Sequence, residues 1–282
     1  MGNGSVADPP IMSVLTKHFL GSTGLQTAAL GLGTVKWGRN EGLKHAPFAL
    51  PDDATCLRLL DAAEAAGVNL LDVAPAYGIA EERLGRLLAG RRDQFLLFSK
   101  TGEIFEGGQS SWDFSADHTR RSVEESLRRL QTDRLEAVLL HCPREDLSVI
   151  RDTAALEVLH SMKAAGLIRA VGISTMSLAG GLAAVPLCDL VMVAWNTGFH
   201  EQQPVVEAAA AAGKGILLKK VLASGDLSAG GAVPAGMKAL DYRLRSALGL
   251  PGHPVVIAGT ITPSHLEENL AAAAAGAWPE AD

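Results

Sequence analysis

The sequence alternates short apolar runs with longer amphipathic runs, and this repeat restricts the fold more than any other feature. The short runs are almost continuously apolar, which is typical of parallel strands covered on both faces. The eight runs are TAALGLGTV (27–35), VNLLDV (68–73), FLLFS (95–99), EAVLLH (136–141), RAVGIS (169–174), LVMVAW (190–195), GILLKK (215–220) and PVVIAGT (254–260). Strands that are each followed by a helix predict a closed (β/α)8 TIM barrel, an α/β fold of roughly this length.

The segments between the strands carry helix start and stop signals. DDATCLRLLDAAEAAG places Asp52 at the predicted N-cap and Gly67 just beyond the helix. SADHTRRSVEESLRRL begins at Ser115 and puts Val123 and Leu127 on one face. The runs TAALEVLHSMKAAG and TPSHLEENLAAAAAG follow the same plan, and each ends in glycine. A doubly wound open sheet is the alternative, but no GxGxxG turn follows an early strand.

No interdomain linker is visible, so residues 17–282 are predicted to form one barrel domain. Barrels of this kind reach such a length as single domains. The stretch KHFLGSTGLQTAAL (17–30) alternates around Gly-Ser-Thr-Gly. It predicts a β-hairpin that caps the N-terminal, bottom end of the barrel. Residues 1–16 are predicted to be a flexible N-terminal tail.

Composition argues against several classes of partner. The formal net charge of −6 disfavours nucleic acid, which requires a clustered basic surface. No run of roughly 18 apolar residues occurs, so a membrane span is not expected. The cysteines Cys56, Cys142 and Cys188 form no CxxC pair, which suits a reducing compartment. The first residues lack the basic and apolar regions of a signal peptide, and we therefore expect a cytoplasmic protein.

Polar side chains end three neighbouring predicted strands. The second strand ends at Asp72, with Tyr77 in the loop that follows, the third ends in Lys100 and the fourth in His141. Each residue alone has a structural explanation, such as a turn cap or the first solvated position. The functional residues of such barrels lie at the C-terminal ends of the strands. The coincidence of four ionisable residues at these ends therefore predicts a catalytic site.

The chemistry of this set follows from proton affinities. A phenol with a pKa of about 10 is a weak acid at neutral pH unless a cation lies beside it. Lys100 is placed to supply that cation, and Asp72 to hold it charged. Tyr77 is then a general acid, while His141 orients the substrate oxygen and stabilises the developing alkoxide. None of these groups supplies a hydride, so a redox reaction requires a cofactor.

Several stretches together resemble the aldo-keto reductase family, from about Lys17 to about Ala275. They are FLGSTGLQTAALGLGTVKWG, LLDVAPAYGIAEERLGRLL, LLFSKTG, SLRRLQTDRLEAVLLHCP, GLIRAVGIST and TPSHLEENLAAA. The resemblance implies a barrel that reduces carbonyls with NADPH bound across its mouth. The family's Asp-Tyr-Lys-His tetrad corresponds to Asp72, Tyr77, Lys100 and His141, all intact.

The resemblance is weaker on the nicotinamide side. Ser174-Thr175 stand where the family has Ser-Asn, which holds the carboxamide. Met192 replaces a Gln that assists there, and Lys219 replaces an aromatic that stacks on the ring, with Trp195 as an alternative stacking residue. The cofactor site implied by the resemblance also includes Gly33, Thr34, Asp72, Val221, Leu222, Ser224 and Gly225.

The last strand and helix bear on cofactor choice. Thr260 and His265 stand where family members offer a Ser or Thr and an Arg to the 2′-phosphate, and Glu268 and Asn269 remain for the adenine. A histidine is only partly charged at pH 7, so it holds phosphate less strongly than arginine. A helix N-terminus still binds phosphate through its N–H groups. NADP(H) is favoured, with NAD(H) as the alternative.

The substrate is expected to enter an open pocket walled by loops 36–51, 102–116 and 221–236. The predicted pocket residues are the aromatics Trp37, Phe105, Trp112 and Phe199, with Phe114 as a further candidate. Aromatic residues in loops suit an apolar carbonyl compound.

These features predict an NAD(P)H-dependent oxidoreductase that reduces an aldehyde or ketone to an alcohol, or the reverse, with the proton from Tyr77. One alternative is a nucleotide-binding regulatory or partner subunit of the same fold, because the nicotinamide contacts are altered. Another is a non-redox isomerase or dehydratase that uses the same tetrad. A metal hydrolase is not expected, because the strand ends lack His-x-His and clustered carboxylates. The natural substrate, the direction and the oligomeric state are open.

Overall fold

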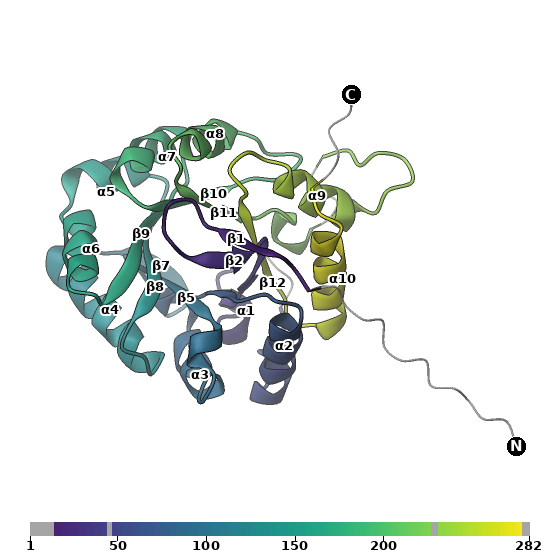
Figure 1. Cartoon of the computed structure of the whole chain (residues 1–282). Coiled ribbons are helices and arrows are strands. Elements are labelled where there is room, and N and C mark those ends of the chain that lie inside the picture. Colours follow the sequence, from purple (N-terminus) through teal and green to yellow (C-terminus); the bar gives the residue numbers. More distant parts are fainter. Residues whose placement is uncertain (1–13, 44–46, 227–230, 278–282) are drawn as a thin grey trace, which may run out of the picture.

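The structure is a computed structural model that describes residues 14–43, 47–226 and 231–277. Its centre is a closed barrel of parallel strands that follow one another around the ring in chain order (Figure 1). The strands are β3 (Leu30–Gly33), β4 (Leu70–Asp72), β5 (Leu96–Thr101), β8 (Leu135–His141), β9 (Ile168–Ser174), β10 (Leu190–Ala194), β11 (Gly215–Lys219) and β12 (Val255–Gly259). The predicted TIM barrel is confirmed.

Helices form the outer layer of the barrel (Figure 1). They include α2 (Asp53–Ala65), α3 (Ala80–Leu87), α4 (Ala116–Arg129), α6 (Ala155–Ala164), α7 (Leu178–Ala184), α8 (Gln203–Ala211), α9 (Ala239–Leu248) and α10 (Pro263–Ala274). Two further helices, α1 (Val35–Gly38) and α5 (Asp146–Asp152), follow β3 and β8. Within the described ranges, no helix has both the length and the apolar character needed to cross a membrane.

The predicted helix caps are present. Asp52 Oδ1 accepts a hydrogen bond from Thr55 N at 2.7 Å, and Ser115 Oγ accepts one from His118 N at 3.2 Å. Gly67 has a φ of +83°, the left-handed conformation that commonly ends a helix. The local signals in the sequence therefore fix where α2 and α4 begin and where α2 ends.

The barrel interior is filled by apolar side chains that the predicted hairpin completes. This hairpin is the antiparallel pair β1 (Lys17–Phe19) and β2 (Gln26–Ala28). Its turn residues Leu20 and Leu25, each 1% exposed, pack in one cluster with inward-facing strand residues such as Phe98 and Leu217. The hairpin therefore closes the bottom of the barrel, as predicted.

The predicted N-terminal tail lies mostly outside the described residues, since only 14–16 of it are described. Leu15 is 7% exposed, and its N–H donates a hydrogen bond to Ala66 O at 2.9 Å. Leu15 therefore packs on the apolar core, although it precedes the predicted domain boundary at residue 16.

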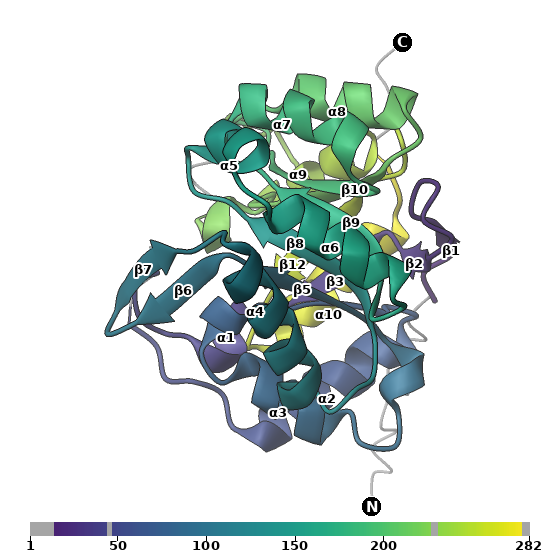
Figure 2. The same cartoon turned by 90° about the vertical axis from the view of Figure 1, so that its left-hand side faces the viewer.

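A second hairpin lies at the opposite end of the barrel, in a segment predicted to be a loop. β6 (Glu103–Glu106) and β7 (Gln109–Trp112) pair antiparallel around Gly107 and Gly108, whose φ values are +57° and +80°. Figure 2 shows this hairpin and the β1–β2 hairpin at opposite ends of the molecule. The β6–β7 hairpin thus stands at the C-terminal ends of the barrel strands.

Candidate active site

Four ionisable side chains meet at the C-terminal ends of β4, β5 and β8. Lys100 Nζ donates hydrogen bonds to Asp72 Oδ1 at 2.6 Å and to Val73 O at 2.9 Å. The same Nζ lies 4.7 Å from the ring centroid of Tyr77. The rings of Tyr77 and His141 meet edge to face, with centroids 6.1 Å apart. The structure therefore brings together the four residues singled out in the sequence.

Local backbone geometry turns Tyr77 back over β4. Pro75 begins a single turn of 3-10 helix, η1 (Pro75–Tyr77), which suits the fixed φ of proline. Gly78 follows with a φ of +59°, where glycine is favoured. A Cβ at Gly38 of α1 would collide with the backbone of Tyr77 and Ala80. The stretch PAYG therefore holds the phenol close to the strand end that carries Asp72.

Burial dominates the acidity of Tyr77. Burial raises the pKa of Tyr77 to about 12, and the nearby Lys100 ammonium lowers it by less than burial raises it. Burial also lowers the pKa of Lys100, but Asp72 and Tyr77 reverse this, so its net pKa is raised. We expected the cation to make the phenol a stronger acid. The direction of the Lys100 effect is as expected, but the net shift of the Tyr77 pKa is upward because burial outweighs the cation, and the charge of Asp72 adds to the rise.

His141 has a carboxylate neighbour that the sequence did not indicate. Its Nδ1 lies 2.8 Å from Glu103 Oε2, on β6. Burial raises the pKa of Glu103, but His141, Ser110 and Arg39 together lower it to about 2. Burial lowers the pKa of His141, and Glu103 offsets only part of that effect. At neutral pH these two shifts favour an ionised Glu103 carboxylate beside a neutral His141 imidazole.

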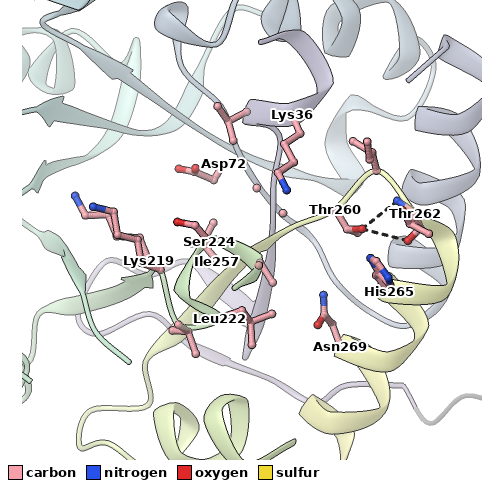
Figure 3. A pocket seen from close by; sticks show the side chains of 18 of the residues that line it. Lys36, Asp72, Lys219, Leu222, Ser224, Ile257, Thr260, Thr262, His265 and Asn269 are labelled. Atoms are coloured by element: carbon pink, nitrogen blue, oxygen red, sulfur yellow. Dashed lines mark hydrogen bonds between the residues drawn. The ribbon is translucent and has the colours of Figure 1, made fainter. Parts of the chain in front are cut away.

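Three residues of the tetrad, Asp72, Tyr77 and His141, line a cavity of about 650 Å³ at the barrel mouth, whereas the buried Lys100 does not. Figure 3 shows Lys36, His265 and Asn269 reaching toward it from α1 and α10. The predicted residues that line it are Gly33, Asp72, Tyr77, His141, Lys219, Val221, Leu222, Ser224, Gly225, Thr260, His265, Glu268 and Asn269. The predicted site residues do not include the other lining residues, which are Val35, Lys36, Met176, Lys220, Leu240, Ile257, Ala258, Gly259, Ile261 and Thr262. A lone lysine after the first strand, in GTVKWG, was a usable signal for Lys36.

Four predicted cofactor residues do not line this cavity. Thr34 is buried, and its Oγ1 donates to Asp72 O at 2.8 Å. Ser174 and Thr175 are fully buried, and Ser174 Oγ accepts a hydrogen bond from Lys219 Nζ at 2.8 Å. Met192 packs in the cluster inside the barrel, because the strand alternation turns its side chain inward. Lys219 thus stands between Ser174 and the cavity.

None of the predicted substrate-pocket aromatics lines the cavity. Trp37 is fully buried, and its Nε1 donates to Thr260 O at 2.9 Å. Phe114 packs in the core at 8% exposure. The ring of Phe105 lies 3.4 Å from the guanidinium carbon of Arg39. Trp112 and Phe199 are 45% and 38% exposed. Trp37 and Phe114 are therefore corrected to structural residues, whereas the other three lie outside this cavity in the structure.

Comparison with known families agrees with this geometry. The model of the aldo/keto reductase family matches residues 29–241. The chain belongs to the aldo/keto reductase family. Nicotinamide cofactors are general in this family.

Individual aldo/keto reductase relatives are similar over different spans. The aldo-keto reductase YhdN of Bacillus subtilis is 33% identical over 168 residues, a match that covers 56% of this chain but only 46% of YhdN. The D-threo-aldose 1-dehydrogenase of a Pseudomonas species is 30% identical over 243 residues, covering 76% of this chain and 71% of the relative. A crystal structure described as an aldo-keto reductase of Pseudomonas aeruginosa is 43% identical, with a TM-score of 0.84, and the match covers 94% of this chain and 98% of that chain. These similarities support an enzyme of the aldo-keto reductase type.

Proposed function

We propose that this chain is an NAD(P)H-dependent oxidoreductase that interconverts an aldehyde or ketone and the corresponding alcohol. The observation that carries the proposal is the placement of Tyr77. Its ring lies over the buried Lys100–Asp72 ion pair and against His141, on the wall of a 650 Å³ cavity. A cavity of this size suits a small-molecule or cofactor ligand. The four side chains supply the proton chemistry that carbonyl reduction needs.

Two parts of the cavity wall have features that suit a dinucleotide: the backbone at Gly33 and Gly259, and the side of α10 that faces the cavity. Gly33 and Gly259 pair at the ends of β3 and β12, and a Cβ at Gly259 would lie 2.9 Å from Gly33 O, so backbone forms this wall. Asn269 Oδ1 is buried without a hydrogen-bond partner among the described residues, which suits a base amine. His265 lies in the first turn of α10, where backbone N–H groups favour phosphate. We favour NADP(H), with NAD(H) as the alternative.

The residues of the chain then act on the substrate oxygen. A nicotinamide supplies the hydride when it is bound. Tyr77 Oη donates its proton to the oxygen on which negative charge develops. The Lys100 ammonium stabilises the phenolate that remains, and Asp72 keeps this ammonium charged and in place. A pKa of about 12 for Tyr77 still allows this transfer, because an alkoxide is more basic than a phenolate.

Removal of the Tyr77 hydroxyl tests the proposed oxidoreductase function. Tyr77→Phe keeps the ring but not the acid, so we expect nucleotide binding to be unchanged while carbonyl turnover falls roughly 10²- to 10⁴-fold. Nucleotide binding is measured by calorimetry and turnover by nicotinamide absorbance. The carbonyl panel includes aldoses, because D-threo-aldose 1-dehydrogenase is among the relatives. Undiminished turnover in Tyr77→Phe contradicts the proposed role of the phenol.

A nucleotide-binding subunit without turnover is the second candidate. It is favoured by Lys219, an ammonium at a position where the family has a ring that stacks on the nicotinamide. Stoichiometric nucleotide binding by the wild-type chain, with no turnover on the whole panel in either direction, supports this second candidate. Product formation without a change in nicotinamide absorbance instead indicates the non-redox alternative.

A further inference from the structure

A buried carboxylate outside the tetrad contacts one of its members. Glu103 Oε1 accepts hydrogen bonds from Ser110 Oγ at 2.6 Å and from Arg39 Nη1 at 3.2 Å. Its other oxygen, Oε2, lies 2.8 Å from His141 Nδ1. The side chain of Glu103 is only 11% exposed and that of Arg39 8%. Both carboxylate oxygens are therefore engaged, and one of them faces the imidazole.

The surroundings hold Glu103 in this position. Arg39 donates a further hydrogen bond to Ala76 O at 3.2 Å, and its guanidinium lies on the Phe105 ring. Ser110 comes from β7, the strand paired with β6, so the hairpin itself supplies one donor. The carboxylate is thus fixed by Arg39, which directly follows α1, and by its own hairpin. It is not a mobile surface acid that contacts His141 by chance.

An ionised carboxylate can only accept hydrogen bonds, and this decides the state of the neighbouring ring. The pKa of Glu103 is lowered to about 2, so the group is an anion at all ordinary pH values. His141 Nδ1 is buried and forms no aligned hydrogen bond with any described residue, and the carboxylate oxygen Glu103 Oε2 lies 2.8 Å from it. A neutral imidazole beside this anion carries its proton on Nδ1, which leaves a lone pair on Nε2. Since His141 lines the cavity, Nε2 is the nitrogen available to a ligand.

We propose that Glu103 is a positioning residue that fixes His141 as the Nδ1–H tautomer, so that Nε2 of the neutral ring accepts a hydrogen bond from a substrate hydroxyl. The consequence for substrate binding rests on the proposed oxidoreductase function. An alcohol offers a hydroxyl donor to Nε2, whereas a carbonyl oxygen needs a donor there. His141 becomes such a donor only as an imidazolium. Glu103 therefore makes the neutral site an alcohol-binding site; for oxidation, the hydroxyl hydrogen must rotate from Nε2 to the Tyr77 oxygen before it leaves the substrate.

Charged groups from every side of His141 set the pH at which this preference changes. Burial lowers the pKa of His141, and Lys100 from β5 and Lys219 from β11 lower it further, while Glu103 from β6 raises it. Tyr77 packs edge-on against the ring as an uncharged phenol. Below the pKa of His141 its imidazolium offers a hydrogen-bond donor to a carbonyl oxygen. Above that pKa the neutral imidazole offers an acceptor to an alcohol hydroxyl. Loss of the Glu103 anion lowers the pKa of His141, so the change from donor to acceptor occurs at lower pH.

Nitrogen NMR of the ligand-free protein tests the tautomer directly. Long-range ¹H–¹⁵N spectra of the wild-type chain, with His141→Gln to assign the signals, are expected to show protonated Nδ1 and bare Nε2. Glu103→Gln should reduce this preference about tenfold, the loss of one hydrogen bond to a charged group. The matched control is Ser110→Ala, which removes a contact to Oε1 and leaves Oε2 beside Nδ1. A wild-type spectrum with the proton on Nε2 overturns the proposal.

Kinetics give a second readout. Glu103→Gln is expected to raise the KM for an alcohol about tenfold at pH 8 and to change the KM for the matching carbonyl less, with Ser110→Ala near wild type. An equal rise for both substrates overturns the binding part of the proposal. If the chain proves to have no oxidoreductase activity, the NMR result still decides the tautomer. If Tyr77→Phe is inactive but the proton lies on Nε2, the proposed function stands and this inference fails.

Discussion

Lys219 Nζ donates a hydrogen bond to Ser174 Oγ at 2.8 Å, reaching from the end of β11 to the end of β9. Its other polar contact is the sulfur of Met176, at 3.6 Å, and no carboxylate pairs with it among the described residues. Burial lowers the pKa of Lys219 to about 7, and the charges of Lys220 and Lys100 act in the same direction. This side chain therefore changes its charge close to neutral pH, on the wall of the proposed nicotinamide site.

Nucleotide affinity should depend on pH through this lysine. The Lys219 ammonium is present below its pKa of about 7 and lost above it. An anionic dinucleotide should therefore bind more tightly at pH 6 than at pH 8, by roughly three- to tenfold for one nearby cation. Calorimetric titration with NADH measures this, because NADH lacks the 2′-phosphate, which itself titrates near pH 6. Lys219→Met should flatten the dependence.

The control for Lys219→Met is Lys17→Met, an exposed lysine in the hairpin at the opposite end of the barrel. It removes the same charge from the chain without altering the cavity. Two results contradict the role of Lys219 in this pH dependence. One is a wild-type affinity that is the same at pH 6 and pH 8, and the other is an equal change in Lys219→Met.

The Asp72–Lys100 ion pair should behave as a buried pair. Both side chains are nearly inaccessible, at 6% and 1% exposure. Asp72→Asn leaves a buried ammonium without its counterion, so we expect the free energy of unfolding to fall by about 3–5 kcal/mol at pH 7. Asp72→Asn/Lys100→Met removes both charges and should recover much of that loss. Denaturant unfolding measures the free energy of unfolding of the single and the double variant. Equal free energies for the two variants contradict the expected role of the buried ion pair.

His265 should set part of the preference between NADP(H) and NAD(H). It lines the cavity from the first turn of α10. Arginine keeps its full charge and binds phosphate through two N–H groups, so His265→Arg should tighten NADPH binding about tenfold relative to NADH. The ratio of the two dissociation constants is the measurement, and NADH serves as the internal control. If His265→Arg leaves the ratio of the two dissociation constants unchanged, His265 does not lie beside the 2′-phosphate.

The barrel and its tetrad could be predicted from the sequence because the signals are local and repeated. Each buried strand is a run of apolar residues, and the polar residue that ends it lies at the mouth in any barrel of this type. Asp72, Lys100 and His141 obey this rule without exception. The caps Asp52 and Ser115 were readable for the same reason, since a cap forms within a few residues of its own helix.

Contacts between distant loops could not be predicted in the same way. Glu103 lies next to His141 across two segments that are far apart in the sequence, and a single carboxylate in a predicted loop has no periodic signal. The two short runs that flank Gly107-Gly108 were a usable hairpin signal, yet they do not reveal which side chain faces the site. Trp37 illustrates the opposite error, because an aromatic in a loop packs in the core as readily as it lines a pocket.

The hairpin that closes the bottom of the barrel has a consequence for the supply of protons. Leu20 and Leu25 fill the lower end, and apolar side chains such as Phe98 occupy the axis above them. Among the described residues, this apolar cluster separates the phenol of Tyr77 from the bottom of the barrel, so we expect water to reach it from the mouth. If a dinucleotide and substrate bind in the mouth as proposed, they close this route, and each turnover then uses a proton that Tyr77 took up before the ligands bound. Proton exchange with solvent is thus expected at the mouth of the barrel and not at its closed bottom.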